Sequence, residues 1–138
     1  MSTENKLKHL EFVQSVINRM AANSFLLKGW TVTLVAALFA LAAKDSDKKY
    51  IVVAYFPVVV FWILDAYFLS RERLFRNLYD GVRKKKEGEV DFSMDTEPFV
   101  DGRTRWTASF FSATLLIFYG TMILLMIFVM YFVERISS

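Results

Sequence analysis

The chain alternates between charged segments and three long apolar runs. The first run, 24–43, contains a single charge at Lys28, and the second, 50–70, contains a single charge at Asp65. The third run, 106–133, contains none. About 20 helical residues cross a hydrocarbon core of about 30 Å, so each run is long enough to span a membrane. The pattern predicts an all-α integral membrane protein with three transmembrane helices, the third of which must tilt or extend beyond the bilayer.

The first two spans are joined by only six residues, "KDSDKK" at 44–49, and are therefore expected to form an antiparallel hairpin. Apolar residues at three- and four-residue spacing predict that both helices continue beyond the membrane. Before the first span they are Leu7, Leu10, Val13, Val16, Ile17 and Met20, and after the second span they are Leu74, Phe75, Leu78, Tyr79 and Val82. We expect two long helices, 5–43 and 50–86, whose parts outside the membrane pack against each other as a stalk on the side of the N-terminus. Together with the third span they form a single membrane domain, 1–138. The alternative is that each amphipathic stripe lies on the membrane surface.

A connecting segment, 87–105, leads from the stalk to the third span. Its part 87–101 carries six acidic residues and no basic one, and it follows a basic cluster of Arg83, Lys84, Lys85 and Lys86. A solvated linker and a partner-docking segment both fit this composition. The basic cluster is a candidate contact for a protein partner or for lipid headgroups.

Lysine and arginine are distributed unevenly between the two sides of the predicted membrane. The side of the N-terminus carries twelve near the spans: Lys6, Lys8, Arg19, Arg71, Arg73, Arg76, Arg83, Lys84, Lys85, Lys86, Arg103 and Arg105. The opposite side carries four: Lys44, Lys48, Lys49 and Arg135. Because cytoplasmic loops are enriched in lysine and arginine, this distribution predicts a multi-pass protein with a cytoplasmic N-terminus.

The composition supports a membrane location and excludes some other classes. At 55% hydrophobic and 17% aromatic, the chain is too apolar for a water-soluble domain of 138 residues. The net charge of +3 is too small to indicate a nucleic-acid partner. With no cysteine, disulfides and thiolate metal sites are excluded. The first apolar run begins too late and is too long for a cleavable signal peptide.

Lys28 and Asp65 are the two charges inside the first two spans. A hairpin loop centred near residue 46 places them at equal depth, roughly 5–10 Å below the cytoplasmic boundary at 1.5 Å per residue. The third span adds hydroxyl groups to this intramembrane polar layer: Thr107, Ser109, Ser112 and Thr114. An unpaired charge at a span centre costs about 2.5–3.5 kcal/mol on insertion scales. Three interpretations remain: a structural pair, independent snorkelling to the headgroups, and a gating or ion-path role.

Small residues predict close helix packing, and they group on one face of each of two spans. On the first span they are Gly29, Thr33, Ala37 and Ala40, and on the third Ser109, Ala113 and Gly120. Helices associate in lipid through close packing at such residues, so part of this face is expected to contact another subunit. Pro57 lies early in the second span and is a candidate hinge, although a tolerated proline is the simpler interpretation.

No catalytic motif accompanies these features. His9 has no sequence partner and is expected on the stalk surface. The chain has no glycine-rich phosphate loop, no H-E-x-x-H and no nucleophile in a recognisable frame. We therefore expect a protein that is not an enzyme and that needs no metal or other cofactor.

Three stretches carry a resemblance to a known group: "INRMAANSFLLKGWTVTLVAALFALAA", "FWILDAYFLSRERLFRNLYD" and "DFSMDT". They resemble small multi-pass bacterial membrane proteins of anti-phage defence and conflict loci, and the hairpin is loosely similar to the SLATT class of two-span effectors. The resemblance implies an effector that assembles in the inner membrane and perturbs it, controlled by a protein partner or a nucleotide signal. The third span departs from the two-span SLATT pattern, so it is in doubt whether the pore architecture of that class applies to this chain.

Three functional hypotheses follow. The first is an oligomeric inner-membrane effector that forms or gates a lesion. The second is a scaffold that anchors a cytoplasmic protein through residues 83–98. The third is a small channel or transport component in which Asp65 relays an ion or a proton.

Overall fold

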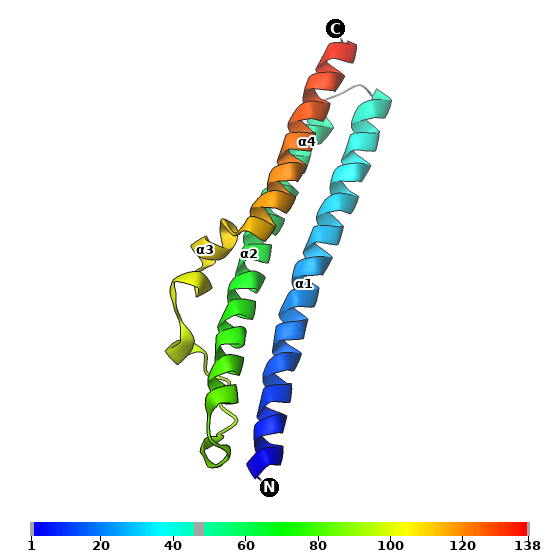
Figure 1. Cartoon of the computed structure of the whole chain (residues 1–138). Coiled ribbons are helices and arrows are strands. Elements are labelled where there is room, and N and C mark those ends of the chain that lie inside the picture. Colours follow the sequence, from blue (N-terminus) through cyan, green and yellow to red (C-terminus); the bar gives the residue numbers. More distant parts are fainter. Residues whose placement is uncertain (1, 46–48, 138) are drawn as a thin grey trace.

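The computed structural model describes residues 2–45 and 49–137, and its regular structure within these residues is helical. Two long helices, α1 (Ser2–Asp45) and α2 (Lys49–Lys84), run antiparallel and side by side along the molecule (Figure 1). The remaining elements are η1 (Glu87–Glu89), η2 (Glu97–Phe99), η3 (Gly102–Thr104), α3 (Trp106–Phe110) and α4 (Ala113–Ser137). The helix α4 lies beside only one half of the pair formed by α1 and α2 (Figure 1).

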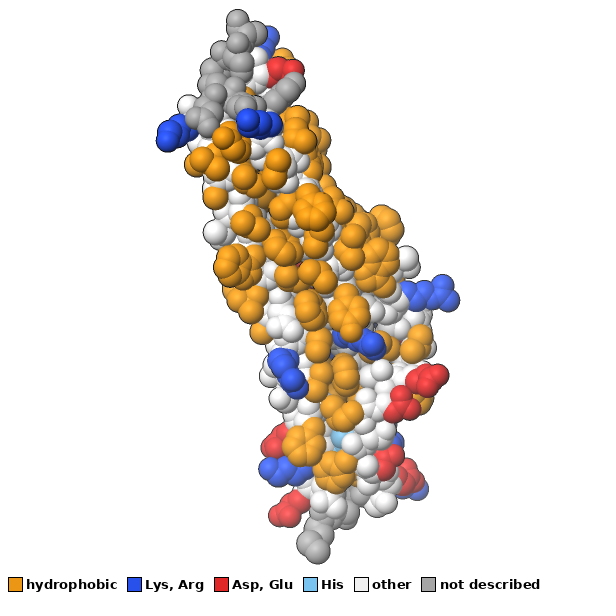
Figure 2. All heavy atoms as spheres, turned by 180° about the vertical axis from the view of Figure 1, so that it is seen from behind, with side chains coloured by type: hydrophobic (Ala, Val, Ile, Leu, Met, Phe, Trp, Pro, Cys, Tyr) orange, Lys and Arg blue, Asp and Glu red, His pale blue; other side chains and the backbone are white. Residues whose placement is uncertain are grey.

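Three helices are long and apolar enough to cross a membrane: Thr3–Lys44, Lys49–Lys84 and Ala113–Arg135. The predicted all-helical chain with three candidate spans is therefore confirmed. Figure 2 shows a broad apolar band over the half of the molecule that contains α4, with most charged side chains towards the two ends. Within this band, buried side chains of all three helices form one apolar cluster, which includes Val35, Val58, Tyr119 and Met126.

The half without α4, formed by residues 2–23 of α1 and 71–84 of α2, is here named the two-helix extension. Members of the two predicted apolar stripes are buried between its helices, namely Val13, Ile17, Leu78 and Val82. Both helices begin earlier than expected, α1 at residue 2 and α2 at residue 49, and α2 ends at residue 84 rather than 86. Of the predicted hairpin loop 44–49, residues 46–48 lie outside the described residues.

The predicted single helix over 106–133 is wrong, because the third apolar run contains a break. The helix α3 ends at Phe110, and α4 begins at Ala113. The hydroxyl oxygen of Ser112 accepts a hydrogen bond from the amide of Leu115 at 3.4 Å, which is the position of a helix N-cap. The indole N–H of Trp62 donates to the Phe110 carbonyl oxygen at 3.0 Å. These two side chains stabilise a break that hydropathy alone does not reveal.

The connecting segment 87–105 runs back along α2 (Figure 1). Three α2 side chains donate hydrogen bonds to its carbonyl groups: Ser70 to Thr104, Arg73 to Arg103 at 2.9 Å, and Asn77 to Phe99 at 2.9 Å. The Phe99 ring lies against Gly81, where an added Cβ would stand 2.8 Å from the Cζ atom of Phe99. The part from Phe99 to Thr104 is thus attached to α2 and is not a free linker.

His9 is buried, which corrects the expectation of a surface histidine. Its Nε2 lies 2.8 Å from the carbonyl oxygen of Ser93, and its ring centroid lies 5.5 Å from that of Phe92. Phe92 has a φ of 58° and also contacts Phe12 of α1. The connecting segment therefore covers one face of α1, a long-range contact that the helical pattern could not predict.

Candidate functional site

The most polar feature within the apolar half is an ion pair between α1 and α2. Lys28 Nζ lies 2.6 Å from Asp65 Oδ2, a short charge-assisted contact. The Asp65 side chain is fully buried, and that of Lys28 is 19% exposed. The register predicted from the hairpin loop therefore places two opposite charges in direct contact.

Two further hydroxyl groups complete the coordination of the Asp65 carboxylate. Ser24 of α1 donates a short hydrogen bond to Oδ1, and Tyr119 of α4 donates to Oδ2 at 2.9 Å. Ser24 also accepts a hydrogen bond from Lys28 Nζ at 2.8 Å. The site, defined by Ser24, Lys28, Asp65 and Tyr119 and named the ion-pair network, connects all three long apolar helices.

The network satisfies a buried carboxylate that would be costly alone. Burying a charge requires compensating partners, and Asp65 has one cation and two hydroxyl donors. Such a pair contributes less to stability than its short distance suggests, since both ions lose hydration. A rearrangement that separates α1 from α2 would leave a charge unpaired in an apolar environment, so the pair disfavours such rearrangements.

Ser24 and Tyr119 were missed from the sequence, although both carry a recognisable signal. Ser24 lies four residues before Lys28 and so shares its helix face. Tyr119 is a phenol within an apolar run, and a buried tyrosine hydroxyl usually finds a hydrogen-bond partner.

The predicted hydroxyl groups of the third run take different positions. Ser112 caps α4, and Ser109 is buried with no hydrogen bond to its hydroxyl among the described residues. Thr107 is exposed, whereas Thr114 lines a groove together with Lys28. None of the four contacts Asp65 in the described hydrogen bonds, so the predicted layer is narrower than expected. The sequence predicts the depth of each residue in the membrane but not the direction in which its side chain faces around the helix axis. The four side chains face directions that keep them out of contact with Asp65.

The small-residue face of α1 points away from the rest of the chain. Gly29, Thr33, Ala37 and Ala40 are all exposed or partly exposed, and nothing lies within 4 Å of a Cβ built on Gly29. On α4, Ala113 is exposed and Gly120 is partly exposed. These residues are therefore accessible to another helix.

The two other predicted features are Pro57 on α2 and the basic cluster 83–86 at and just beyond the end of that helix. Pro57 is inside the helix, which continues on both sides of it. Of the basic cluster, Arg83 pairs with Asp80 at 3.6 Å and Lys85 with Asp91 at 3.4 Å, whereas Lys84 and Lys86 are exposed. At 1.5 Å per residue, the end of α2 lies about 28 Å from Asp65 along the helix axis.

No group of three or more His, Asp or Glu side chains lies close enough to hold a metal ion within the part of the chain that the structure describes. No protein-family model, curated protein or solved structure matches this chain. The ion-pair network is therefore interpreted from its geometry alone.

Proposed function

We propose that this chain is an oligomeric effector of the bacterial inner membrane that forms or gates a membrane lesion, and that the ion-pair network holds its closed state. The observation that carries the proposal is the contact of Lys28 with Asp65, buried where the three candidate membrane spans meet. A fully paired charge within an apolar bundle is a natural two-state element, since its alternative partner is water in a polar lumen.

The extension offers a mechanical route to this element. Because α1 and α2 each continue from the two-helix extension into the apolar half, a displacement of one helix against the other at the extension would change the distance between Lys28 and Asp65. In the proposed orientation the N-terminus is cytoplasmic, so the extension is the cytoplasmic stalk. A cytoplasmic protein or a nucleotide would open the lesion by binding the displaced stalk more tightly than the resting one.

Association between copies would use the exposed small residues of α1, because close backbone approach is the main source of helix affinity in lipid. The lipid bilayer and further copies of the chain are thus the proposed partners within the membrane. The resemblance to anti-phage effectors supports a role in stopping an infected cell. A neighbouring gene for a cyclase, a TIR protein or a reverse transcriptase would strengthen that role.

The test is inducible expression in bacterial cells with a potential-sensitive dye. We expect the wild-type chain, triggered by its partner system, to depolarise the cells, and Asp65→Asn to depolarise them without the trigger. Asp65→Asn keeps the side-chain shape but leaves Lys28 without a counter-charge. Unchanged potential for both proteins, at equal amounts in the membrane fraction, would contradict the proposal.

A second candidate function is a scaffold, supported by the exposed Lys84 at the far end of α2 and the exposed Lys86 just beyond it. This end is too distant from the apolar half for these side chains to reach headgroups if the stalk is upright. Affinity purification would then recover a stoichiometric cytoplasmic protein, and its loss in Lys84→Glu/Lys86→Glu, with unchanged membrane potential, would select this function.

A further inference from the structure

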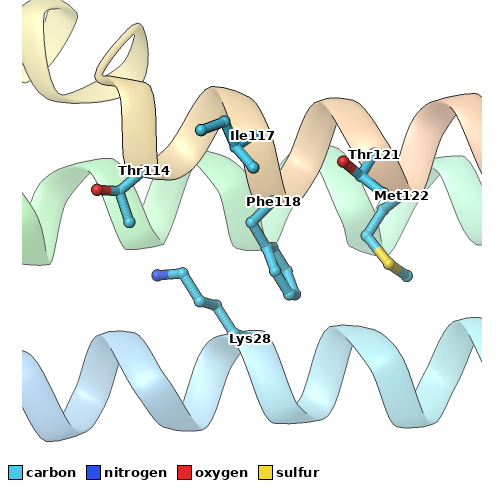
Figure 3. Close-up of a pocket in the computed structure, with 6 residues that line it drawn as sticks. All are labelled: Lys28, Thr114, Ile117, Phe118, Thr121 and Met122. Atoms are coloured by element: carbon cyan, nitrogen blue, oxygen red, sulfur yellow. The ribbon is translucent and has the colours of Figure 1, made fainter.

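A lateral groove adjoins the ion-pair network between α1 and α4. It has a volume of about 630 Å³ and is lined by Lys28 of α1 and, on α4, by Thr114, Ile117, Phe118, Thr121 and Met122. Figure 3 shows the Lys28 side chain extending from α1 towards the end of the groove near Thr114, while Phe118 and Met122 project from α4 further along. The groove has the size of a small-molecule site.

A second hollow of about 350 Å³ continues this groove towards the two-helix extension. It shares Lys28 and Thr114 and adds Ser24 and the carboxylate side chain of Glu72, which is paired with Arg76 at 2.8 Å. The combined groove is mostly apolar, and the polar groups Ser24, Lys28 and Glu72 of its second hollow lie at the end nearer the extension. This gradient matches that of a phospholipid whose headgroup faces the same side as the N-terminus.

The ammonium group of Lys28 has one donor left for a ligand. An ammonium carries three N–H groups, and two are directed to Ser24 at 2.8 Å and Asp65 at 2.6 Å. The backbone of Lys28 lies four residues, or about 6 Å of helix, inside the start of the span, but its ammonium reaches back to Ser24 and so lies near the boundary, within reach of lipid ester and phosphate oxygens. The third N–H is thus available to an oxygen at that depth.

We propose that this groove binds one phospholipid, whose phosphate accepts a hydrogen bond from Lys28 and whose acyl chain lies along Phe118 and Met122. A helix of a second copy is a poorer occupant, because the three apolar runs contain one acidic residue, Asp65, which is already paired within its own copy. Lipid supplies an oxygen that accepts from the third N–H of Lys28 and an apolar chain at once. The proposal depends on the membrane location but not on the effector activity.

The experiment uses the full chain in lipid nanodiscs that contain trace amounts of a phosphatidylethanolamine or phosphatidylglycerol with a photoreactive diazirine in the acyl chain. A diacylglycerol with the same chain serves as the phosphate-free comparison. Labelled residues are located by mass spectrometry. We expect both phospholipids to label the α4 side of the groove above the rest of the apolar surface, and the diacylglycerol to label it roughly tenfold less, as expected for the loss of one hydrogen bond to a charged group.

Matched tryptophan variants localise the effect. Ile117→Trp fills the groove, whereas Ile127→Trp places the same ring at another exposed position of α4 outside it. We expect Ile117→Trp to reduce groove labelling to the level of the general surface and Ile127→Trp to leave it unchanged. If Ile117→Trp is not monodisperse, the wild-type chain decides the same question by competition. Excess unlabelled phospholipid should then reduce labelling of the groove by the photoreactive phospholipid, and excess diacylglycerol should not.

Even labelling of all exposed apolar residues, or equal labelling by diacylglycerol, would overturn the lipid site. So would a benzoylphenylalanine at Thr121 that crosslinks to a second copy of the chain instead of to lipid. Neither readout requires membrane leakage. A chain that binds phospholipid but never depolarises cells therefore contradicts only the proposed function, and a leaking chain without groove labelling contradicts only the lipid site.

Discussion

The energetic coupling between Lys28 and Asp65 can be measured by a double-mutant cycle. The variants are Lys28→Met, Asp65→Asn and both together, which remove the charges while keeping side-chain length or shape. Removing one partner of a buried ion pair costs about 3–5 kcal/mol in soluble proteins. Because Lys28 is 19% exposed and near the end of its span, we expect each single variant to lose about 2–3 kcal/mol of unfolding free energy.

The double variant should lose much less than the sum of the two. It leaves no unpaired charge, and the amide oxygen that Asp65→Asn introduces still accepts from the hydroxyl groups of Ser24 and Tyr119. With a loss of about 1 kcal/mol in the double variant, the coupling energy is on the order of 3–5 kcal/mol. The exposed pair Lys8–Glu11, 3.5 Å apart and with side chains 65% and 67% exposed, is the control and should couple by less than about 0.5 kcal/mol.

The assay is equilibrium unfolding in mixed micelles, followed by circular dichroism and by the fluorescence of the three tryptophans. The cycle is valid if all variants unfold in a single transition. A coupling energy for Lys28 and Asp65 no larger than that of the exposed control pair would refute the argument that burial makes this pair decisive.

Three further predictions concern the connecting segment and α4. Gly81→Ala should displace the Phe99 ring and speed amide hydrogen exchange in residues 96–104, with the helical content unchanged. Gly88→Ala is the control and should have no such effect, because a Cβ at Gly88 meets nothing within 4 Å. The backbone N–H of Ser93, and after it Lys85, lowers the pKa of Asp91. The turn at residues 91–93 should therefore be stable above the ordinary aspartate pKa of about 4 and should loosen as the pH falls through the depressed pKa. Hydrogen exchange measures this effect, which should be absent in Asp91→Asn. Ser112→Ala should remove the α4 cap and cost about 1 kcal/mol in thermal or denaturant unfolding, and Ser112→Thr, which keeps the hydroxyl group, should restore most of it.

The sequence was most informative where a single periodic pattern decides the structure. About twenty apolar residues predict a span regardless of context, and a six-residue loop fixes which positions of two antiparallel helices face one another. Lys28 and Asp65 were matched in depth on that basis, and the structure places their charged atoms in contact. Hydropathy and helix rise thus suffice for the layers of this fold.

Features that depend on rotation about a helix or on irregular backbone could not be predicted in the same way. Ser109 and Ser112 were grouped with the ion pair by depth, but depth does not say which side a side chain faces. The break before α4 depends on a hydrogen bond from Trp62, 48 residues away in sequence. The burial of His9 depends on Phe92 and Ser93, which reach it through an irregular segment.

The most direct test of the central claim is the permeability of liposomes that contain the purified chain. Wild-type vesicles are expected to retain an entrapped ion gradient, and Asp65→Asn vesicles to lose it, because the unpaired Lys28 favours a water-filled arrangement of the spans. Lys28→Met/Asp65→Asn, which leaves no charge in the first two spans, should be as tight as wild type. Asp65→Asn vesicles that hold the gradient as well as wild type would contradict the account, and a wild-type flux abolished by Asp65→Asn would instead select a transport role.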